Sequence, residues 1–314
     1  MIFSQTTISK APLLLLGAPP RSGNHLLRGL LDNHPQLLLP PDEDYFVRQL
    51  SRHVLLRLRG MLAKPYDVLS ICRKLQKDGH FERVNSGLGT EVFGSEGSLD
   101  LEAYYQYMCQ HHKRGKINGL VRNHVEALAV ALGHVDGDGR LRVIFSALQS
   151  KHRDLSRIAR LLARGYNLRG IFLVRDPRAH LASRLVRNPT LDVRRFCQSQ
   201  NRYWREIEQF SANFGPVMRL RFESLVTDTE TCMRRVCDFA EINFLPTVLE
   251  YTQGGEPSRS NSSFAASSGI DREVLTRHRN ILPQETAAYV QKHCLPQLFW
   301  HGSGVGVTTA GAEL

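Results

Sequence analysis

The apolar residues of the chain gather in short runs that predict β-strands. Residues 13–16 are four consecutive leucines, and the run at 169–174 reads Arg-Gly-Ile-Phe-Leu-Val. Weaker runs at 37–39, 141–145 and 217–222 predict three more strands. Short apolar runs that are bounded by glycine, proline or charged residues are typical of strands buried on both faces of a sheet.

Between these runs, the apolar residues follow the three- and four-residue spacing of helices. The first predicted helix begins at Asn24 and places Leu27 and Leu31 on one side. Further helices are predicted from Asp42 and Pro177 and at 65–77, 99–114, 117–133, 153–164, 191–213, 228–241 and 283–299. Strands separated by helices predict an α/β fold, with a parallel sheet wrapped by helices. In such a sheet, ligands bind at the carboxyl ends of the strands.

The length of 314 residues is sufficient for one large α/β domain with a sizeable core. We predict that this domain covers residues 12–300, between a flexible lead-in at 1–11 and a disordered tail at 301–314. Within the domain, 42–134 is predicted to be a helical insertion. The segment 79–98 is rich in glycine and serine, and its length is typical of a lid or a substrate loop.

The charge of the chain favours anionic ligands. The formal net charge is +11, and 33 of the 41 basic residues are arginine. Guanidinium groups suit two-point contacts to phosphate, sulfate or carboxylate, although a solvated basic surface has the same composition. The chain has no zinc-finger spacing, no aromatic RNA-binding motif and no isolated basic tail, so we expect no nucleic-acid partner.

The cysteines and the hydropathy indicate a cytoplasmic protein. The six cysteines show no spacing typical of a metal site, so we interpret them as free thiols in a reducing compartment. They are Cys72, Cys109, Cys197, Cys232, Cys237 and Cys294. No segment reaches the ~18 apolar residues of a membrane span.

A loop rich in glycine and proline joins the strand at 13–16 to the helix that begins at Asn24. It contains Gly17, Arg21, Ser22 and Gly23. A buried strand, a tight loop and a helix N-terminus make an anion site, because backbone N–H groups and the helix dipole converge there. The loop lacks the lysine and the magnesium-binding hydroxyl of the Gly-x4-Gly-Lys-Ser/Thr motif, which disfavours an ordinary ATP or GTP hydrolase. A plain strand-to-helix glycine turn is the alternative interpretation.

A second arginine follows the strand at 169–174. Arg175 and Ser183 are eight residues apart, and Ser183 lies on the helix predicted from Pro177. One guanidinium and one hydroxyl can clamp a phosphate group. Alternatively, Arg175 pairs with Asp176 or another carboxylate, and Ser183 caps the backbone.

Taken in order, these motifs resemble those of the bacterial-type PAPS-dependent sulfotransferases, where PAPS is 3′-phosphoadenosine 5′-phosphosulfate. The first motif is Pro-Arg-Ser-Gly-Asn-His-Leu-Leu at 20–27, followed by Leu-Asp-Asn-His-Pro at 31–35. The second is Val-Arg-Asp-Pro-Arg-Ala at 174–179, with its serine at Ser183. The third is Leu-Arg-Phe-Glu-Ser-Leu at 220–225, and the last runs from Asn-Ser-Ser at 261–263 to Arg-His-Arg at 277–279.

The resemblance implies a P-loop-like fold with PAPS as co-substrate and no metal. By position, the 5′-phosphosulfate contacts come from one stretch of the chain: Arg21, Ser22, Gly23, Asn24, His25 and Leu26. Arg175 and Ser183 match the residues that hold the 3′-phosphate, and Arg277 or Arg279 closes over the nucleotide. His25 departs from the family pattern, which usually has serine or threonine at that position.

The resemblance also implies a catalytic base that removes the proton of an acceptor hydroxyl during in-line transfer. Glu43 fits the family position best, and Asp42 is the second choice. Both also suit the first turn of a helix, where acidic residues complement the helix dipole. His25 is a rival base. Lys151 resembles a family lysine that touches the sulfonate, or it is an ordinary surface lysine.

Two other classes of function remain open from the sequence. One is a phosphotransferase or nucleotide kinase, which would need magnesium. The other is a non-enzymatic protein that binds sulfated or phosphorylated polymers. For a sulfotransferase, the insertion at 42–134 would lie on the acceptor side, and the acceptor would be a sugar, a lipid headgroup, a small metabolite or a protein. Neither the acceptor nor the oligomeric state is written in the sequence.

Overall fold

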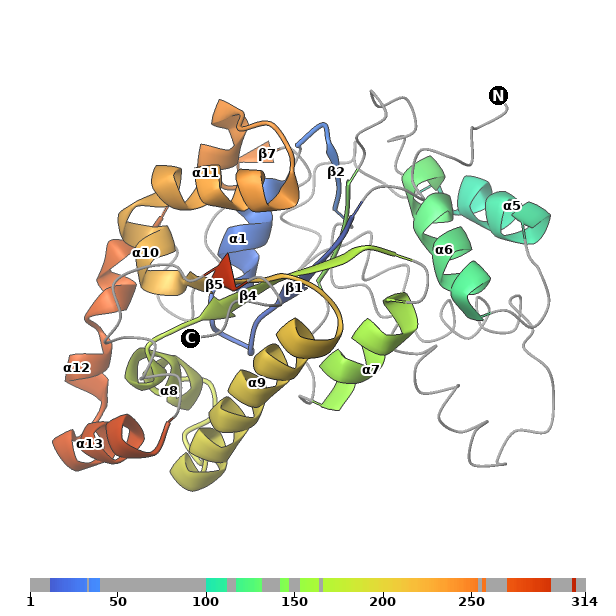
Figure 1. Ribbon diagram of the computed structural model, residues 1–314. Coiled ribbons are helices and arrows are strands. Elements are labelled where there is room, and N and C mark those ends of the chain that lie inside the picture. The colour runs from blue at the N-terminus through green and yellow to red at the C-terminus, as the bar shows by residue number, and fades with distance from the viewer. Residues whose placement is uncertain are drawn as a thin grey trace, which may run out of the picture.

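The computed structural model describes residues 12–32, 34–39, 100–111, 117–131, 142–146, 153–163, 166–253, 256–257, 270–294 and 307–308. Its main sheet has the strand order β2-β3-β1-β4-β5-β8 (Figure 1). The strands are β1 (Leu13–Gly17), β2 (Leu37–Leu38), β3 (Arg142–Ser146), β4 (Leu168–Val174), β5 (Val217–Arg221) and β8 (Val307–Thr308). Neighbouring strands from β2 to β5 are parallel, and β8 is antiparallel to β5.

Helices separate the parallel strands, so the predicted α/β fold is confirmed. They are α1 (Asn24–Leu31), α5 (Leu101–His111), α6 (Ile117–Ala131), α7 (Arg153–Leu162), α8 (Pro177–Leu185), α9 (Val193–Asn213), α10 (Phe222–Thr227), α11 (Thr229–Ala240), α12 (His278–Ile281) and α13 (Gln284–His293). Two 3-10 helices, η2 (Pro246–Leu249) and η3 (Arg272–Leu275), and a hairpin of β6 (Thr252–Gln253) and β7 (Glu256–Pro257) follow α11.

The leucines of β1 explain why this strand lies inside the sheet. Leu13 and Leu15 pack into a core with α7 and α9, whereas Leu14 and Leu16 pack into a second core with α1 and α11. Figure 1 shows these two pairs of helices on opposite sides of the sheet. All four side chains are buried, and each contributes about 1.5–3 kcal/mol of hydrophobic stabilisation.

The register of the sheet brings three turns together at the edge formed by the carboxyl ends of the strands. Gly17 at the end of β1 pairs with Phe172 of β4, and Val174 at the end of β4 pairs with Arg221 at the end of β5. Because the three strands are parallel, the segments that leave them meet at the same edge. Helices α8, α12 and α13 pack together next to this edge (Figure 1).

The structure differs from the sequence predictions in several places. The helix predicted at 283–299 ends at His293, with Cys294 as its C-cap. The predicted strand 217–222 ends at Arg221, because Phe222 begins α10 and turns its ring toward the edge described above. The predicted loop 253–272 contains β7 and the start of η3. Disorder was predicted for 301–314, whereas the structure places Val307–Thr308 as an edge strand.

Other sequence predictions lie outside the described residues. They include the helix predicted from Asp42, the helix at 65–77 and the loop at 79–98. The limits of the predicted domain and of its insertion at 42–134 therefore stay predictions.

Candidate functional site

The loop between β1 and α1 has two residues in the left-handed backbone region. Arg21 has a φ of 74° and Gly23 has a φ of 98°. Glycine adopts this conformation without strain, but for a residue with a side chain it costs roughly 1–2 kcal/mol. A Cβ atom at position 23 would also lie 2.2 Å from the ring of Phe222. Within the loop, the Ser22 N–H donates to the Pro19 carbonyl at 3.1 Å, and contacts from outside the loop also hold Arg21 in this conformation.

Arg175 supplies one of these contacts. It follows β4 directly, and its Nη1–H donates to the backbone oxygen of Arg21 at 2.8 Å. Its Nη2–H donates to the carbonyl of Val274 in η3 at 3.4 Å, and its guanidinium lies 4.5 Å from the centre of the Phe222 ring. One side chain thus joins the segments that follow β1, β4 and β5 to η3.

Arg175 remains charged, and one of its N–H groups has no hydrogen-bond partner among the described residues. The residue is only 9% exposed, and burial lowers its pKa to about 10, partly offset by the charge of Glu223. It is therefore protonated at neutral pH. Its Nε–H is buried and has no hydrogen-bond partner among the described residues. The same holds for the hydroxyl of Ser22, a residue that is 1% exposed.

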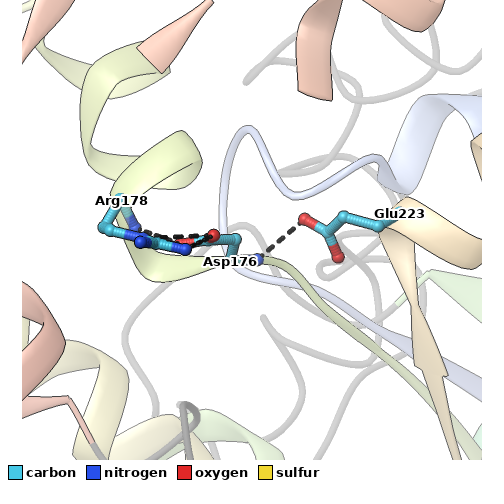
Figure 2. Close-up of polar contacts among 3 residues, drawn as sticks. All are labelled: Asp176, Arg178 and Glu223. Atoms are coloured by element: carbon cyan, nitrogen blue, oxygen red, sulfur yellow. Dashed lines mark hydrogen bonds and ion pairs between the residues drawn. The ribbon is translucent and has the colours of Figure 1, made fainter. Parts of the chain in front are cut away.

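The turn after β4 is built from a capped helix start. Asp176 accepts from the backbone N–H of Arg178 at 2.8 Å and forms an ion pair with its guanidinium at 2.6 Å. Glu223 accepts from the backbone N–H of Asp176 at 2.9 Å, and Figure 2 shows these three side chains in a row. Pro177 occupies the first turn of α8. Asp176 therefore pairs with Arg178, and the alternative in which it pairs with Arg175 is not observed.

Burial affects the two carboxylates of this turn differently. It raises the pKa of Glu223, and the backbone N–H bonds offset this only in part. Burial also acts to raise the pKa of Asp176, but the hydrogen bonds from Arg178 outweigh it and the pKa is lowered overall. Asp176 is therefore ionised at neutral pH.

Positive charge converges on the loop. Burial lowers the pKa of the Arg21 guanidinium, and the charge of Arg187 lowers it further. Burial lowers the pKa of His25 to about 4, with additional contributions from Arg28 and Arg21. The imidazole is therefore uncharged at neutral pH, and the guanidinium groups supply the field that attracts an anion.

The other predicted binding residues differ in their burial and in their contacts. Asn24, His25 and Leu26 form the first turn of α1, and Ser183 is buried in α8. Arg277 forms ion pairs with Asp271 at 2.7 Å and Glu273 at 2.9 Å, whereas Arg279 is exposed. Closure of Arg277 over a ligand would therefore have to break both ion pairs.

The sequence reasoning assigned no role to three residues that shape the site. Phe222 lies against both Gly23 and Arg175, and Glu223 holds the turn after β4. The motif at 220–225 was the available signal for both of them. His180 is fully buried and contacts the loop through the Pro20 carbonyl at 2.7 Å. No spacing in the sequence distinguishes it from an exposed helix residue.

The three candidate residues Glu43, Asp42 and Lys151 lie outside the described residues. Within the described ranges, no group of three or more histidine, cysteine, aspartate and glutamate side chains is placed to hold a metal ion. None of the helices in those ranges is long and apolar enough to cross a membrane.

Comparisons with known proteins match most of the chain. The model of a family described as the sulfotransferase family matches residues 12–246. The solved sulfotransferase domain of the Synechococcus PCC 7002 olefin synthase is 18% identical, with a TM-score of 0.52, and the match covers 94% of this chain and 97% of that one. The sulfotransferase domain from the curacin biosynthetic pathway is 17% identical, with a TM-score of 0.47, over 92% and 98% of the two chains. No curated protein matches the chain.

Proposed function

Because the chain belongs to the sulfotransferase family, we propose that it moves a sulfuryl group from PAPS to the hydroxyl of an acceptor. The observation that carries this proposal is the 2.8 Å hydrogen bond from Arg175 Nη1 to the carbonyl of Arg21. It joins the loop after β1 to the turn after β4, so that two anion-binding segments lie side by side. A donor with phosphate at both its 3′ and 5′ positions suits such a pair.

The residues of the edge fit this donor. Arg175 Nε–H and the Ser22 hydroxyl are buried donors with no partner among the described residues, and such groups are costly unless a ligand satisfies them. Arg21, Ser22, Gly23, Asn24, His25 and Leu26 would hold the 5′-phosphosulfate end, and Arg175 and Ser183 the 3′-phosphate. Arg277 or Arg279 would close over the nucleotide.

When bound, PAPS supplies the activated sulfuryl group. The loop N–H groups and the Arg21 guanidinium would stabilise the charge that develops on the leaving oxygen. A base must take the proton of the acceptor hydroxyl, and we propose Glu43 for this role, with Asp42 as the second choice. His25 is the rival base, because with a pKa of about 4 its imidazole is uncharged at neutral pH and can accept a proton. Lys151 is proposed to contact the sulfonate.

Calorimetric titration of the full chain tests the choice of donor. We expect adenosine 3′,5′-bisphosphate, the product that PAPS leaves, to bind at least about tenfold more tightly than ATP with magnesium. Tighter binding of ATP with magnesium would contradict the proposal and favour a phosphotransferase. Binding of polyanions without nucleotide preference, and with a steep dependence on salt, would favour a polymer-binding protein.

A transfer assay tests the chemistry. The full chain is incubated with PAPS that carries a labelled sulfur and with a set of sugars, lipids, metabolites and peptides that bear hydroxyl groups. We expect label in at least one acceptor, and Glu43→Gln should abolish the transfer while the bisphosphate still binds. Turnover that survives this substitution would show that Glu43 is not the base.

A further inference from the structure

Two consecutive carbonyl groups of the loop are held by side chains from the segment that follows β4. Arg175 Nη1–H donates to the Arg21 carbonyl at 2.8 Å, as described above. His180, on the first turns of α8, has its Nε2 atom 2.7 Å from the Pro20 carbonyl. A carbonyl oxygen can only accept, so Nε2 carries a proton and donates. The loop therefore receives a hydrogen bond on each side of Arg21.

The imidazole of His180 is fixed from a second helix. Its Nδ1 atom lies 3.2 Å from the Oε1 atom of Gln200 in α9, and its ring meets the ring of Phe196 edge-on, with centres 5.2 Å apart. Burial lowers the pKa of His180 to about 3, with help from Arg175 and Arg184, so the ring is neutral. Because Nε2 holds the one proton, Nδ1 can only accept, so a hydrogen bond with Gln200 requires the amide to be turned so that its NH2 group takes the place of Oε1.

The geometry of the peptide bond explains what the two hydrogen bonds achieve. The bonds that flank Arg21 are trans, so each carbonyl points away from the N–H of its own peptide plane. His180 fixes the plane between Pro20 and Arg21, and Arg175 fixes the plane between Arg21 and Ser22. The backbone angles of Arg21 are the rotations between these two planes. Together with the turn bond from the Ser22 N–H to the Pro19 carbonyl at 3.1 Å, the two side chains thus hold Arg21 at its φ of 74°.

We propose that His180, oriented by Gln200, is a positioning residue that holds Arg21 in its left-handed conformation and so shapes the loop for the phosphosulfate end of the donor. This inference rests on the proposed function for the identity of the ligand. His180 does not touch the ligand in this arrangement. It acts through the backbone of Pro20 and Arg21, and a loop that is already in its binding shape loses less freedom when the ligand arrives.

Binding measurements on two variants test this role. His180→Leu removes the N–H and keeps the volume, whereas His180→Gln keeps an N–H that can reach the Pro20 carbonyl. We expect His180→Leu to weaken adenosine 5′-phosphate and adenosine 3′,5′-bisphosphate by the same factor, about tenfold, because both share the 5′-phosphate. His180→Gln should restore affinity to within about threefold of the wild type.

Leu181→Ala is the matched control, because Leu181 is the next residue of α8 and is buried in the core beside α9 and α13. It should lower the melting temperature and leave both affinities unchanged. The proposal is overturned if His180→Leu binds both nucleotides as the wild type does. It is also overturned if His180→Gln is as weak as His180→Leu, or if Leu181→Ala loses affinity to the same extent.

Hydrogen exchange of the ligand-free protein separates this role from the proposed function. We expect the amides of Ala18, Arg21, Ser22 and Gly23 to exchange at least about tenfold faster in His180→Leu than in Leu181→Ala. Equal rates would overturn the positioning role whatever the ligand is. A wild-type protein that binds neither nucleotide would overturn the proposed function, while the exchange comparison would still decide the role of His180.

Discussion

The segments that follow β1 and β4 lie next to each other, but they differ in how far their own residues stabilise them. The turn after β4 is built from its own sequence, with Asp176 as the helix cap, Pro177 in the first helical turn and Arg178 paired with the cap. The loop after β1 has a non-glycine residue, Arg21, in the left-handed region. This loop is shaped by one turn bond of its own, from the Ser22 N–H to the Pro19 carbonyl, and by Arg175 and His180 from the other segment.

The site is thus assembled from two segments. The turn after β4 is stabilised mainly by its own residues, and the loop after β1 relies partly on contacts from that turn and from α8. A helix start with a good cap and a proline is stabilised largely by its own residues, and here Glu223 adds one hydrogen bond to the Asp176 N–H. A strained loop persists only where the surrounding structure over-determines it. Changes in the turn after β4 should therefore reach the loop after β1, whereas changes in the loop should remain local.

Phe222→Ala should have the largest effect, because this ring lies against both segments. It contacts the position of Gly23 and the guanidinium of Arg175, and it is buried. We expect a loss of about 3 kcal/mol in the free energy of unfolding, measured by urea denaturation. Phe222→Leu is the control, which should lose less than half as much because it refills most of the space. An equal loss in both variants would contradict a packing role.

Gly23→Ala should have the next largest effect and is a change within the loop. The φ of 98° disfavours any side chain, and the new Cβ would lie 2.2 Å from the Phe222 ring. We expect a loss of about 2 kcal/mol in urea denaturation. Adding Phe222→Leu should relieve the clash, so that the double variant is more stable than the sum of the single effects predicts. Strict additivity would show that the ring does not press on this position.

Lowering the pH should reduce the free energy of unfolding through His25, which lies in the first turn of α1. Its folded-state pKa is about 4, below the ordinary value of 6.5. Between these values the unfolded chain binds more protons, so stability is lost as the pH falls from 6.5 toward 4. We expect the His25 contribution to be about 1 kcal/mol per pH unit in this window. Urea denaturation at pH 7, 6 and 5 should show a shallower slope for His25→Gln, and an unchanged slope would contradict the burial of the imidazole.

Asp176→Ala should have the smallest effect of the four. It removes the cap of α8 and the ion pair with Arg178, which is partly exposed. We expect a loss of about 1 kcal/mol in thermal or urea unfolding. Asp176→Asn keeps an oxygen that can accept from the backbone N–H, so it should lose less than half of that. If the two variants were equally destabilised, the ion pair and not the cap would hold this turn.

The sequence predicted the locally determined features of the site. The leucine run of β1, the glycine loop and the strand before Arg175 each have a signal in neighbouring residues, and the structure contains all three. Phe222 was predicted as strand because the apolar pattern of β5 continues through it. Its turn into α10 is set by contacts with Gly23 and Arg175, which are far away in the sequence.

Two further features depend on tertiary contacts in the same way. His180 is polar and lies among mixed residues of α8, so only the packing of α9 and the loop around it shows that it is buried. The sequence left open whether Arg175 pairs with Asp176 or with another carboxylate. Asp176 pairs with Arg178 instead, because its carboxylate, as the cap of α8, already accepts a hydrogen bond from the Arg178 backbone N–H.

The joining of the two segments into one nucleotide site is tested most directly by removing the 3′-phosphate and Arg175 in turn. The dissociation constants of adenosine 3′,5′-bisphosphate and adenosine 5′-phosphate are measured for the wild type, Arg175→Ala and the distant control Arg234→Ala, whose arginine pairs with Glu230 in α11. We expect the 3′-phosphate to improve binding by about thirtyfold or more in the wild type and the control, and by less than about threefold in Arg175→Ala. An undiminished gain from the 3′-phosphate in Arg175→Ala would contradict the central claim.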